Sequence, residues 1–253
     1  ENVVVSEGVK ELFTGLFANR KMHTISLPNS LVRIGDSAFS GCALLESIII
    51  PEGVEEIGSA AFKNCEHLTS VSIPQSVKSM GDGVFIGCRG LADDKGFVIA
   101  NNAIHAFFGA DREIVVPEGI TSIAGGVFDK TGITSIKLPT TLKKLGSAFT
   151  GCNMLTSIDI PEGITKLFRS TFSGCSRLEK VSLPSTLIEI DDSAFEGCEK
   201  LVEISIPSSV KVIGSGAFRL CSALPEICIP DGVSVINWRT FTGCTSLHSM
   251  HLP

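Results

Sequence analysis

Cysteine is the residue type in this chain whose number and spacing could support chemistry. The chain contains nine cysteines, and eight of them follow a step of 23 residues within two series: Cys42, Cys65 and Cys88, then Cys152, Cys175, Cys198, Cys221 and Cys244. Regularly spaced thiols could form disulfides or bind a metal ion. The sequence has no Cys-x-x-Cys pair and no paired Cys/His spacing of the zinc type, so it does not favour a metal site.

The fixed step also argues against disulfides. If the repeats stack as parallel strands, equivalent cysteines lie about 4.8 Å apart, which is inside the disulfide range for Cα atoms. Their Cβ vectors would run parallel, however, and this leaves the Cβ atoms slightly too far apart for an unstrained bond. Phe and Leu residues flank the position, so we expect free thiols that behave as small buried hydrophobes.

The same step governs other residue types and predicts a solenoid. Phenylalanine stands three residues before each of the eight cysteines, and proline repeats from Pro28 to Pro74 and again from Pro161. One copy of the repeat consists of Leu45, Ile48, Ile50, Pro51, Val54, Ile57, Gly58, Ala61, Phe62 and Cys65. A coil of this size cannot bury its own apolar face, so we expect the coils to stack and form continuous columns of like side chains.

Each part of the repeat predicts a local structure. The Ile-x-Ile step has the period of a strand with one buried face, and the following proline ends that strand. The position of Gly58 is taken by Asp191 and Asn237 in other copies. All three residue types tolerate a positive φ, so this position predicts a left-handed turn. The Ala-Phe step predicts a single helical turn that places the phenylalanine in the core.

The Ile-Pro strand end, the Ile-Gly turn and the Ala-Phe-x-x-Cys segment together resemble the leucine-rich repeats of BspA-like bacterial surface proteins, also called the Treponema pallidum type. This resemblance implies an α/β solenoid, a right-handed leucine-rich-repeat superhelix with a parallel sheet on one face and short helical turns on the other. About 10–11 coils of 23 residues are expected. The resemblance also implies a secreted or cell-surface location and a role in adhesion or host-protein binding. It assigns no binding residue, because the motif positions are core positions.

The repeat predicts one domain over residues 1–253. The chain begins and ends within a repeat, so we expect both ends to be cut from a larger protein. An irregular insertion at about 92–113 interrupts the array, and Asn101-Asn102 within it suits a type I′ β-hairpin turn. We expect residues 97–99 to fill one strand slot and 114–116 to fill the next. A degenerate repeat is the favoured interpretation, against a protruding binding element or a hinge.

Composition narrows the functional classes. The formal net charge is −6 and the pI is about 5.4, and no basic stripe or polybasic run is visible, which argues against nucleic-acid and anionic-lipid partners. No apolar run approaches the ~20 residues of a membrane-spanning helix. Phosphate-binding loops, G-x-S-x-G and H-E-x-x-H motifs are missing, so the sequence predicts neither an enzyme nor a cofactor. We expect a monomer.

Solenoids bind through the variable positions of an extended face. The two exposed positions of each strand flank the first Ile of the Ile-x-Ile step. The candidate binding residues are Ser135, Lys137, Ser157, Asp159, Lys180, Ser182, Glu203, Ser205 and Glu226. This face is rich in serine, carries both signs of charge and has no aromatic residue, which argues against a sugar platform. A partner protein, such as a host or extracellular-matrix protein, is expected. The alternatives are a structural spacer and a carbohydrate-binding module.

The sequence also predicts the location of a few residues outside this set. Trp238 aligns with the side of the coil away from the strands. Cys228 and His251 take the same repeat position on neighbouring strands and could hold an adventitious metal ion, although coincidence is the favoured interpretation. The remaining histidines with no visible partner are expected in solvent: His23, His67 and His105.

Overall fold

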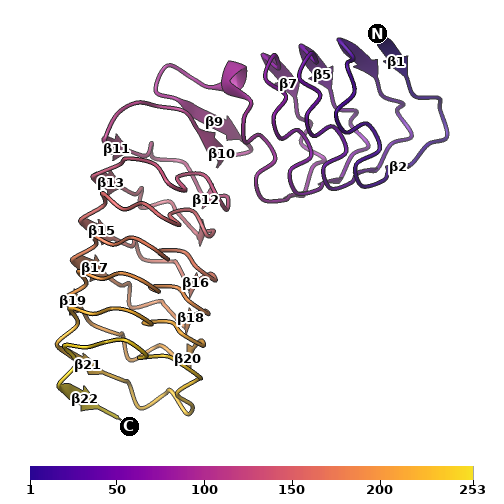
Figure 1. Cartoon of the computed structure of the whole chain (residues 1–253). Coiled ribbons are helices and arrows are strands. Elements are labelled where there is room, and N and C mark those ends of the chain that lie inside the picture. Colours follow the sequence, from indigo (N-terminus) through magenta and orange to yellow (C-terminus); the bar gives the residue numbers. More distant parts are fainter. Residues whose placement is uncertain (253) are drawn as a thin grey trace. The chain divides into compact units, whose positions relative to one another are not determined.

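The computed structural model describes residues 1–252, and Pro253, which closes the last predicted repeat, lies outside the described residues. The chain divides into two compact units, Glu1–Ala110 (unit 1) and Asp111–Pro253 (unit 2) (Figure 1). Each unit is a stack of coils with a short strand on each of two faces. The expectation of one continuous domain over residues 1–253 stays a prediction.

Unit 1 contains two rows of strands and a hairpin. The first row consists of β1 (Asn2–Val4), β3 (Thr24–Ser26), β5 (Ser47–Ile49) and β7 (Ser70–Ser72). The second row consists of β2 (Glu11–Leu12), β4 (Arg33–Ile34), β6 (Glu56–Ile57) and β8 (Ser79–Met80). After these come a 3-10 turn, η1 (Arg89–Leu91), and the strands β9 (Phe97–Ala100) and β10 (Ala103–Phe107). The paired strands within each row are parallel.

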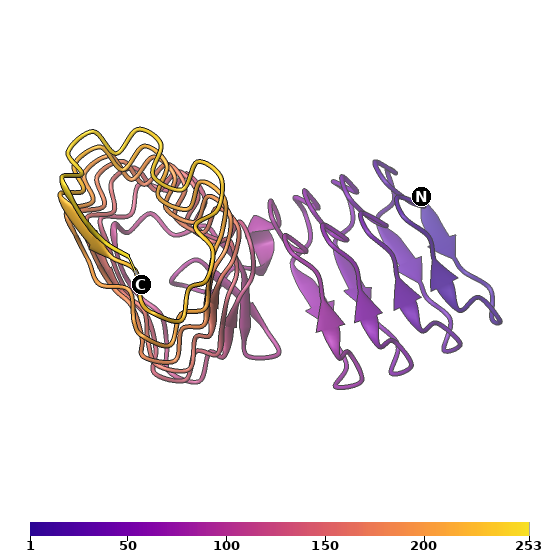
Figure 2. The same cartoon turned by 90° about the horizontal axis from the view of Figure 1, so that it is seen from below.

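Unit 2 repeats this plan over more coils. Its first row consists of β11 (Glu113–Val115), β13 (Ser135–Lys137), β15 (Ser157–Asp159), β17 (Lys180–Ser182), β19 (Glu203–Ile204), β21 (Glu226–Cys228) and β22 (Ser249–His251). Its second row consists of β12 (Ser122–Ile123), β14 (Lys144–Leu145), β16 (Lys166–Leu167), β18 (Glu189–Ile190) and β20 (Val212–Ile213). Figure 2 looks along this stack and shows its coils as nested loops. Parallel pairing and about eleven coils confirm the predicted solenoid.

The core consists of the predicted columns. Phe149, Phe172, Phe195 and Phe218 are fully buried and stack with ring centroids 5.4 Å apart at each step. The central residue of β11, β13, β15, β17 and β21 is buried, as in β15, where Ile158 lies between two exposed neighbours. Each coil is therefore held to the next by two contacts: the inward side chains of the strands pack on one side, and the phenylalanine rings stack on the other.

The predicted helical turns are wrong. Within residues 1–252 the only helical segment is η1, and the Ala-Phe segments are runs of turns. In the turn around Phe39, the N–H groups of Ser37, Phe39 and Gly41 donate to carbonyls of the next coil at 2.7–2.8 Å. The intervening N–H groups of Ser40 and Cys42 donate three residues back along the chain. Because alternate donors are directed at the neighbouring coil, the helical hydrogen-bond ladder cannot continue.

The left-handed turn predicted at the Gly58 position is also wrong. Gly58 does not have a positive φ, whereas Ala60, two residues later, has a φ of 54°. Glycine is required at position 58 because a Cβ atom there would lie 2.5 Å from the backbone nitrogen of Asp36 in the preceding coil. Asn237, at the equivalent position, carries a Cβ atom and donates from Nδ2 to the carbonyl of Ile213 in the preceding coil at 2.7 Å.

The irregular segment contains an antiparallel hairpin. Strands β9 and β10 pair with one bulge, and the turn residues Asn101 and Asn102 have φ values of 48° and 56°. Residues 97–99 were expected to fill a parallel strand slot after β7. Instead, β9 forms backbone hydrogen bonds with β10 and not with β7. Among the described residues, β7 pairs only with β5. Residues 113–115 form β11, the first strand of unit 2.

Of the three histidines expected in solvent, His23 and His67 are exposed, whereas His105 is buried. His105 is 3% exposed and packs edge-on against Phe85, with ring centroids 5.9 Å apart. Neither of its ring nitrogens has a hydrogen-bond partner, and burial lowers the pKa of His105 to about 4. The imidazole is therefore neutral at physiological pH. His23 lies 3.4 Å from a carboxylate oxygen of Glu46, and Nδ1 of His67 lies 2.6 Å from the carbonyl of Ala43.

The phenylalanine column yields a stability prediction. Phe172→Ala should lower the free energy of unfolding by about 3–5 kcal/mol, because the buried ring leaves a cavity between two stacked neighbours. Ser157→Ala removes only an exposed hydroxyl and should be nearly neutral. Denaturant unfolding of both variants measures the difference, and equal losses would contradict the stacking described above.

The close approach at Gly58 yields a second stability prediction. Gly58→Ala should destabilise the protein by about 1–3 kcal/mol, because the added methyl group must displace the backbone of the preceding coil. Gly132→Ala is the matched control, since a Cβ atom there meets no atom within 4 Å. We expect the control to change the unfolding free energy by less than about 0.5 kcal/mol. A neutral Gly58→Ala variant would show that the coils are not held at this spacing.

Candidate binding face

The first-row strands of unit 2 bring the predicted binding residues onto one face. Every candidate is exposed or half-buried, while the residue between each pair points into the core. The strand register places Ser157 beside Lys180 and Lys180 beside Glu203. This row forms the strand face, consisting of Ser135, Lys137, Ser157, Asp159, Lys180, Ser182, Glu203, Ser205 and Glu226. The face exists as expected, and its binding role stays a prediction.

Several charges of the strand face are already paired with one another. Nζ of Lys180 lies 2.6 Å from Oε1 of Glu203, and the hydroxyl of Ser182 donates to Oδ1 of Asp159 at 2.5 Å. The hydrogen bond to Glu203 raises the pKa of Lys180. Both members of the ion pair are more than half exposed, so the pair contributes little to stability.

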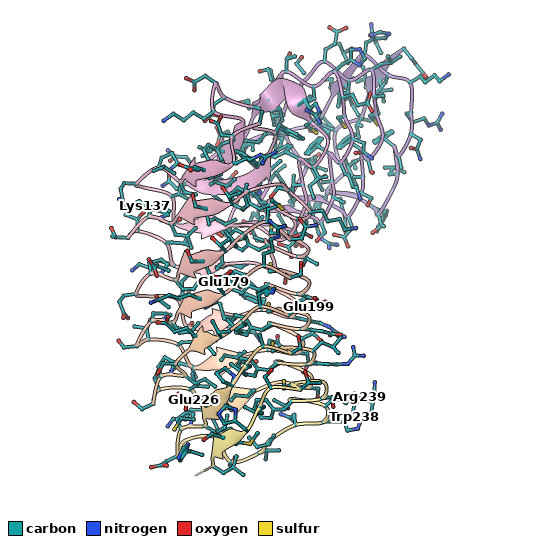
Figure 3. The ribbon with its side chains drawn as sticks, turned by 60° about the vertical axis from the view of Figure 1, so that its left-hand side comes forward. Lys137, Glu179, Glu199, Glu226, Trp238 and Arg239 are labelled. Carbon is teal, nitrogen blue, oxygen red and sulfur yellow. The ribbon has the colours of Figure 1, made fainter. Side chains whose placement is uncertain are left out.

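Two charges of the face remain available. Among the described residues, neither Lys137 nor Glu226 has an ion-pair or hydrogen-bond partner for its side chain. They lie on β13 and β21, toward the two ends of the row, and Figure 3 shows both on the same side of the coils. A partner that contacts the whole row would therefore meet one free positive charge and one free negative charge.

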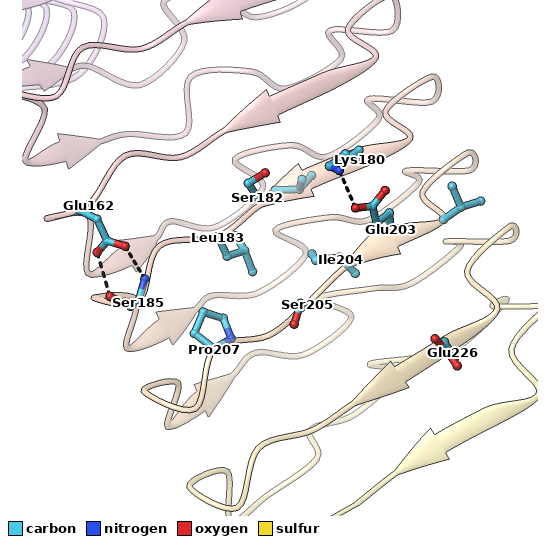
Figure 4. Close-up of a pocket in the computed structure, with 12 residues that line it drawn as sticks. Glu162, Lys180, Ser182, Leu183, Ser185, Glu203, Ile204, Ser205, Pro207 and Glu226 are labelled. Carbon is cyan, nitrogen blue, oxygen red and sulfur yellow. Dashed lines mark hydrogen bonds and ion pairs between the residues drawn. The ribbon is translucent and has the colours of Figure 1, made fainter.

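An open groove of about 620 Å³ crosses the face (Figure 4). It is lined by Lys180, Ser182, Glu203, Ser205 and Glu226 together with Val202 and Pro207. At its margin, Glu162 accepts hydrogen bonds from the backbone N–H and the hydroxyl of Ser185 at 3.0 and 3.1 Å. The backbone hydrogen bond is the main cause that lowers the pKa of Glu162. Glu162 thus connects two coils, and the groove has the shape of a contact surface rather than of a closed catalytic pocket.

Trp238 lies away from the strand face, as its alignment predicts (Figure 3). The indole is 70% exposed, and the guanidinium carbon of Arg239 lies 3.8 Å from the ring centroid. Sequence reasoning did not identify this stacked pair. The signal was present, because an arginine directly follows the only tryptophan of the chain.

The cysteine columns act through hydrogen bonds. All nine cysteines are free thiols, and seven of them are buried. Each thiol of the 23-residue series donates to the carbonyl of a phenylalanine in the preceding coil, as in Cys198 Sγ to Phe172 O at 3.2 Å and Cys221 Sγ to Phe195 O at 3.2 Å. Burial raises the pKa of both thiols. The columns therefore hold buried thiols with a specific polar contact, which an apolar residue of the same size would lose.

Cys228 and His251 are register partners on β21 and β22, as predicted. Within residues 1–252, no group of three or more His, Cys, Asp or Glu side chains is arranged to hold a metal ion. The same part of the chain contains no helix with the length and apolar character needed to cross a membrane.

Parallel strands on one face of stacked coils, an aromatic column inside and variable polar residues outside define a β-solenoid of the leucine-rich-repeat class. The chain belongs to the BspA type leucine rich repeat family, whose sequence pattern matches residues 1–95, 104–224 and 146–253. This confirms the resemblance inferred from the repeat. No curated protein matches the chain.

Solved bacterial structures are similar to the chain, and the two with a TM-score of 0.55 show the same fold. A leucine-rich repeat protein from Bacteroides ovatus is 28% identical with a TM-score of 0.55, over 98% of this chain and 78% of that chain. A leucine rich cell surface protein from Faecalibacterium prausnitzii is 26% identical with a TM-score of 0.48, over 99% and 59% of the two chains. The pneumococcal vaccine antigen PcpA is 20% identical with a TM-score of 0.55, over 98% and 67%.

The thiol environment yields a third prediction. In the native protein an aromatic disulfide reagent should react rapidly with one thiol, that of Cys228, because Cys244 is half-buried and the other seven cysteines are buried. Unfolding in denaturant should release all nine. Cys228→Ser should abolish the fast phase, whereas Cys198→Ser should leave it unchanged. Rapid reaction of several thiols would contradict the buried columns.

Proposed function

We propose that this chain is a non-enzymatic protein-interaction module that acts at the cell surface or outside the cell and binds a partner protein through the strand face. The observation that carries the proposal is the row of exposed polar residues on rigid strands, with Lys137 and Glu226 left without partners. A rigid row of this kind can contact an extended surface without an ordering cost for its backbone. Adhesion and a host or extracellular-matrix partner are supported by the family resemblance.

The chemistry of the face supports a partner protein over a sugar. The face offers hydroxyls and charges of both signs but no aromatic ring for a sugar to stack on. Complementary charge is what gives protein partners their orientation and their association rate. We therefore expect a partner surface with an acidic group opposite Lys137 and a basic group opposite Glu226, and an affinity that falls as salt rises.

The experiment is a binding screen of the protein against extracellular-matrix proteins and glycans, followed by a face variant. Changing Lys137, Asp159, Lys180 and Glu203 together to alanine should weaken a protein hit by about tenfold or more, because the variant removes four charges from successive strands of the row. The control variant changes Glu55, Lys78, Glu199 and Lys200 to alanine, which removes two acids and two lysines from exposed positions outside the first-row strands.

The outcomes separate the candidate functions. Equal loss of affinity in both variants would assign the effect to the loss of surface charges in general rather than to the strand face. A protein hit unaffected by the face variant would place binding elsewhere, and a glycan hit would favour a carbohydrate-binding module. No binding to any protein or glycan would favour a structural spacer.

A further inference from the structure

In unit 1 the first row of strands ends at β7 with an open edge. Among the described residues β7 pairs only with β5, and no backbone hydrogen bond from residues 89–101 reaches residues 69–73. One coil earlier, the N–H of Ile50 donates to the carbonyl of Ser72 at 3.0 Å. Because the coils repeat, the equivalent N–H of Ile73 points to the place of a next strand, where no described acceptor receives it.

The core side chains of this edge are also incompletely covered. Val71 and Ile73 are partly exposed, whereas the equivalent residues one coil earlier, Ile48 and Ile50, are each 3% exposed. The difference arises because each coil covers the apolar side chains of its predecessor, and the chain departs from the repeat after Cys88. The exposed apolar surface at β7 is thus what the next strand of a regular array would bury.

The hairpin forms the opposite wall. Among the described residues, the only strand that pairs with β9 is β10. Ile99 of β9 is 42% exposed. A groove of about 410 Å³ runs between the two strands, lined by Thr69, Ser70, Val71, Ile73, Phe85, Leu91, Val98, Ile99, Ala100 and Asn101. The two strands are labelled in Figure 1. An apolar floor and backbone groups on the β7 wall match the needs of an extended peptide.

Neither wall carries the charged side chains or the proline that often protect an open strand edge. Natural proteins shield such edges with charged side chains, proline or bulges that turn the edge away. The strand residues Ser70, Val71 and Ser72 on one wall and Val98, Ile99 and Ala100 on the other include no charge and no proline. The edge is therefore able to accept another strand.

We propose that the groove between β7 and β9 binds an extended peptide segment of a partner protein, which adds to β7 as a parallel strand. The segment would carry two uncharged β-branched or aliphatic residues, two positions apart, to cover Val71 and Ile73, and its backbone would pair with the open edge. This site lies in unit 1 and would recognise the backbone and the apolar side chains of the peptide, so it is independent of the charged strand face in unit 2.

The test uses the full chain and a synthetic peptide with the sequence of residues 132–139, Gly-Ile-Thr-Ser-Ile-Lys-Leu-Pro, which copies β13 and its flanks. In the free protein, the amides of Val71 and Ile73 should exchange with deuterium at least about tenfold faster than those of Ile48 and Ile50. Excess peptide should slow Val71 and Ile73 by about tenfold. A peptide N-methylated at the residues that copy Thr134 and Lys137 should not, because it lacks the N–H groups that face the preceding strand.

A pair of variants locates the site. Ile99→Lys places a charge on the hairpin wall and should abolish the protection by the peptide. Ile49→Lys is the matched control, since Ile49 is also exposed but lies on the paired strand β5. The proposal is overturned if Val71 and Ile73 are already protected in the free protein, which would mean that the hairpin or a second copy covers the edge. It is equally overturned if millimolar peptide gives no protection, or if the N-methylated peptide protects as well.

Discussion

Backbone hydrogen bonding between successive coils is the constraint on which this structure depends. A coil cannot satisfy its own backbone groups, so alternate N–H groups donate to the neighbour, as Ser37 does to the carbonyl of Ser59. Side chains also form hydrogen bonds between coils. The thiol of Cys65 donates to the backbone carbonyl of Phe39, and the hydroxyl of Thr186 donates to that of Ile164, each in the preceding coil. Each coil must therefore present the same groups at the same level of the stack, which keeps the repeat at 22 or 23 residues wherever the stack is regular.

This constraint determines where function can lie. Residues that contact the adjacent coils are committed to packing and hydrogen bonding, so only the outward positions of the strands and turns can vary. Even there, neighbouring coils compete with a partner for the same groups. Lys180 and Glu203 occupy equivalent positions on adjacent strands and pair with each other. Asp159, at the position equivalent to Lys137, instead accepts a hydrogen bond from Ser182, and Glu226 has the like charge of Glu203 at the equivalent position of the preceding strand. The spacing of charges along the row thus decides which of them a partner can use.

The irregular segment shows what happens where the constraint is interrupted. After Cys88 the chain forms a hairpin, whose strands pair with each other and not with β7. Two consequences follow within unit 1. The last regular strand keeps an open edge with partly exposed core residues, and His105 becomes buried against Phe85 without a hydrogen-bond partner. A break in a repeat is therefore a place where groups that are satisfied elsewhere become available.

The sequence by itself determined the repeat length, the position of the first-row strands, the buried columns of phenylalanine and cysteine, and the outward positions of the strand face. These follow from the alternation of apolar residues and from the fixed step, both of which can be read along one chain. Only the tertiary structure decided the rest. The Ala-Phe segments are turns and not helices, Gly58 is required by close approach and not by its φ, and the cysteine thiols donate to carbonyls. Each of these depends on which backbone atoms of the neighbouring coil lie opposite, and that placement arises only when the coils stack.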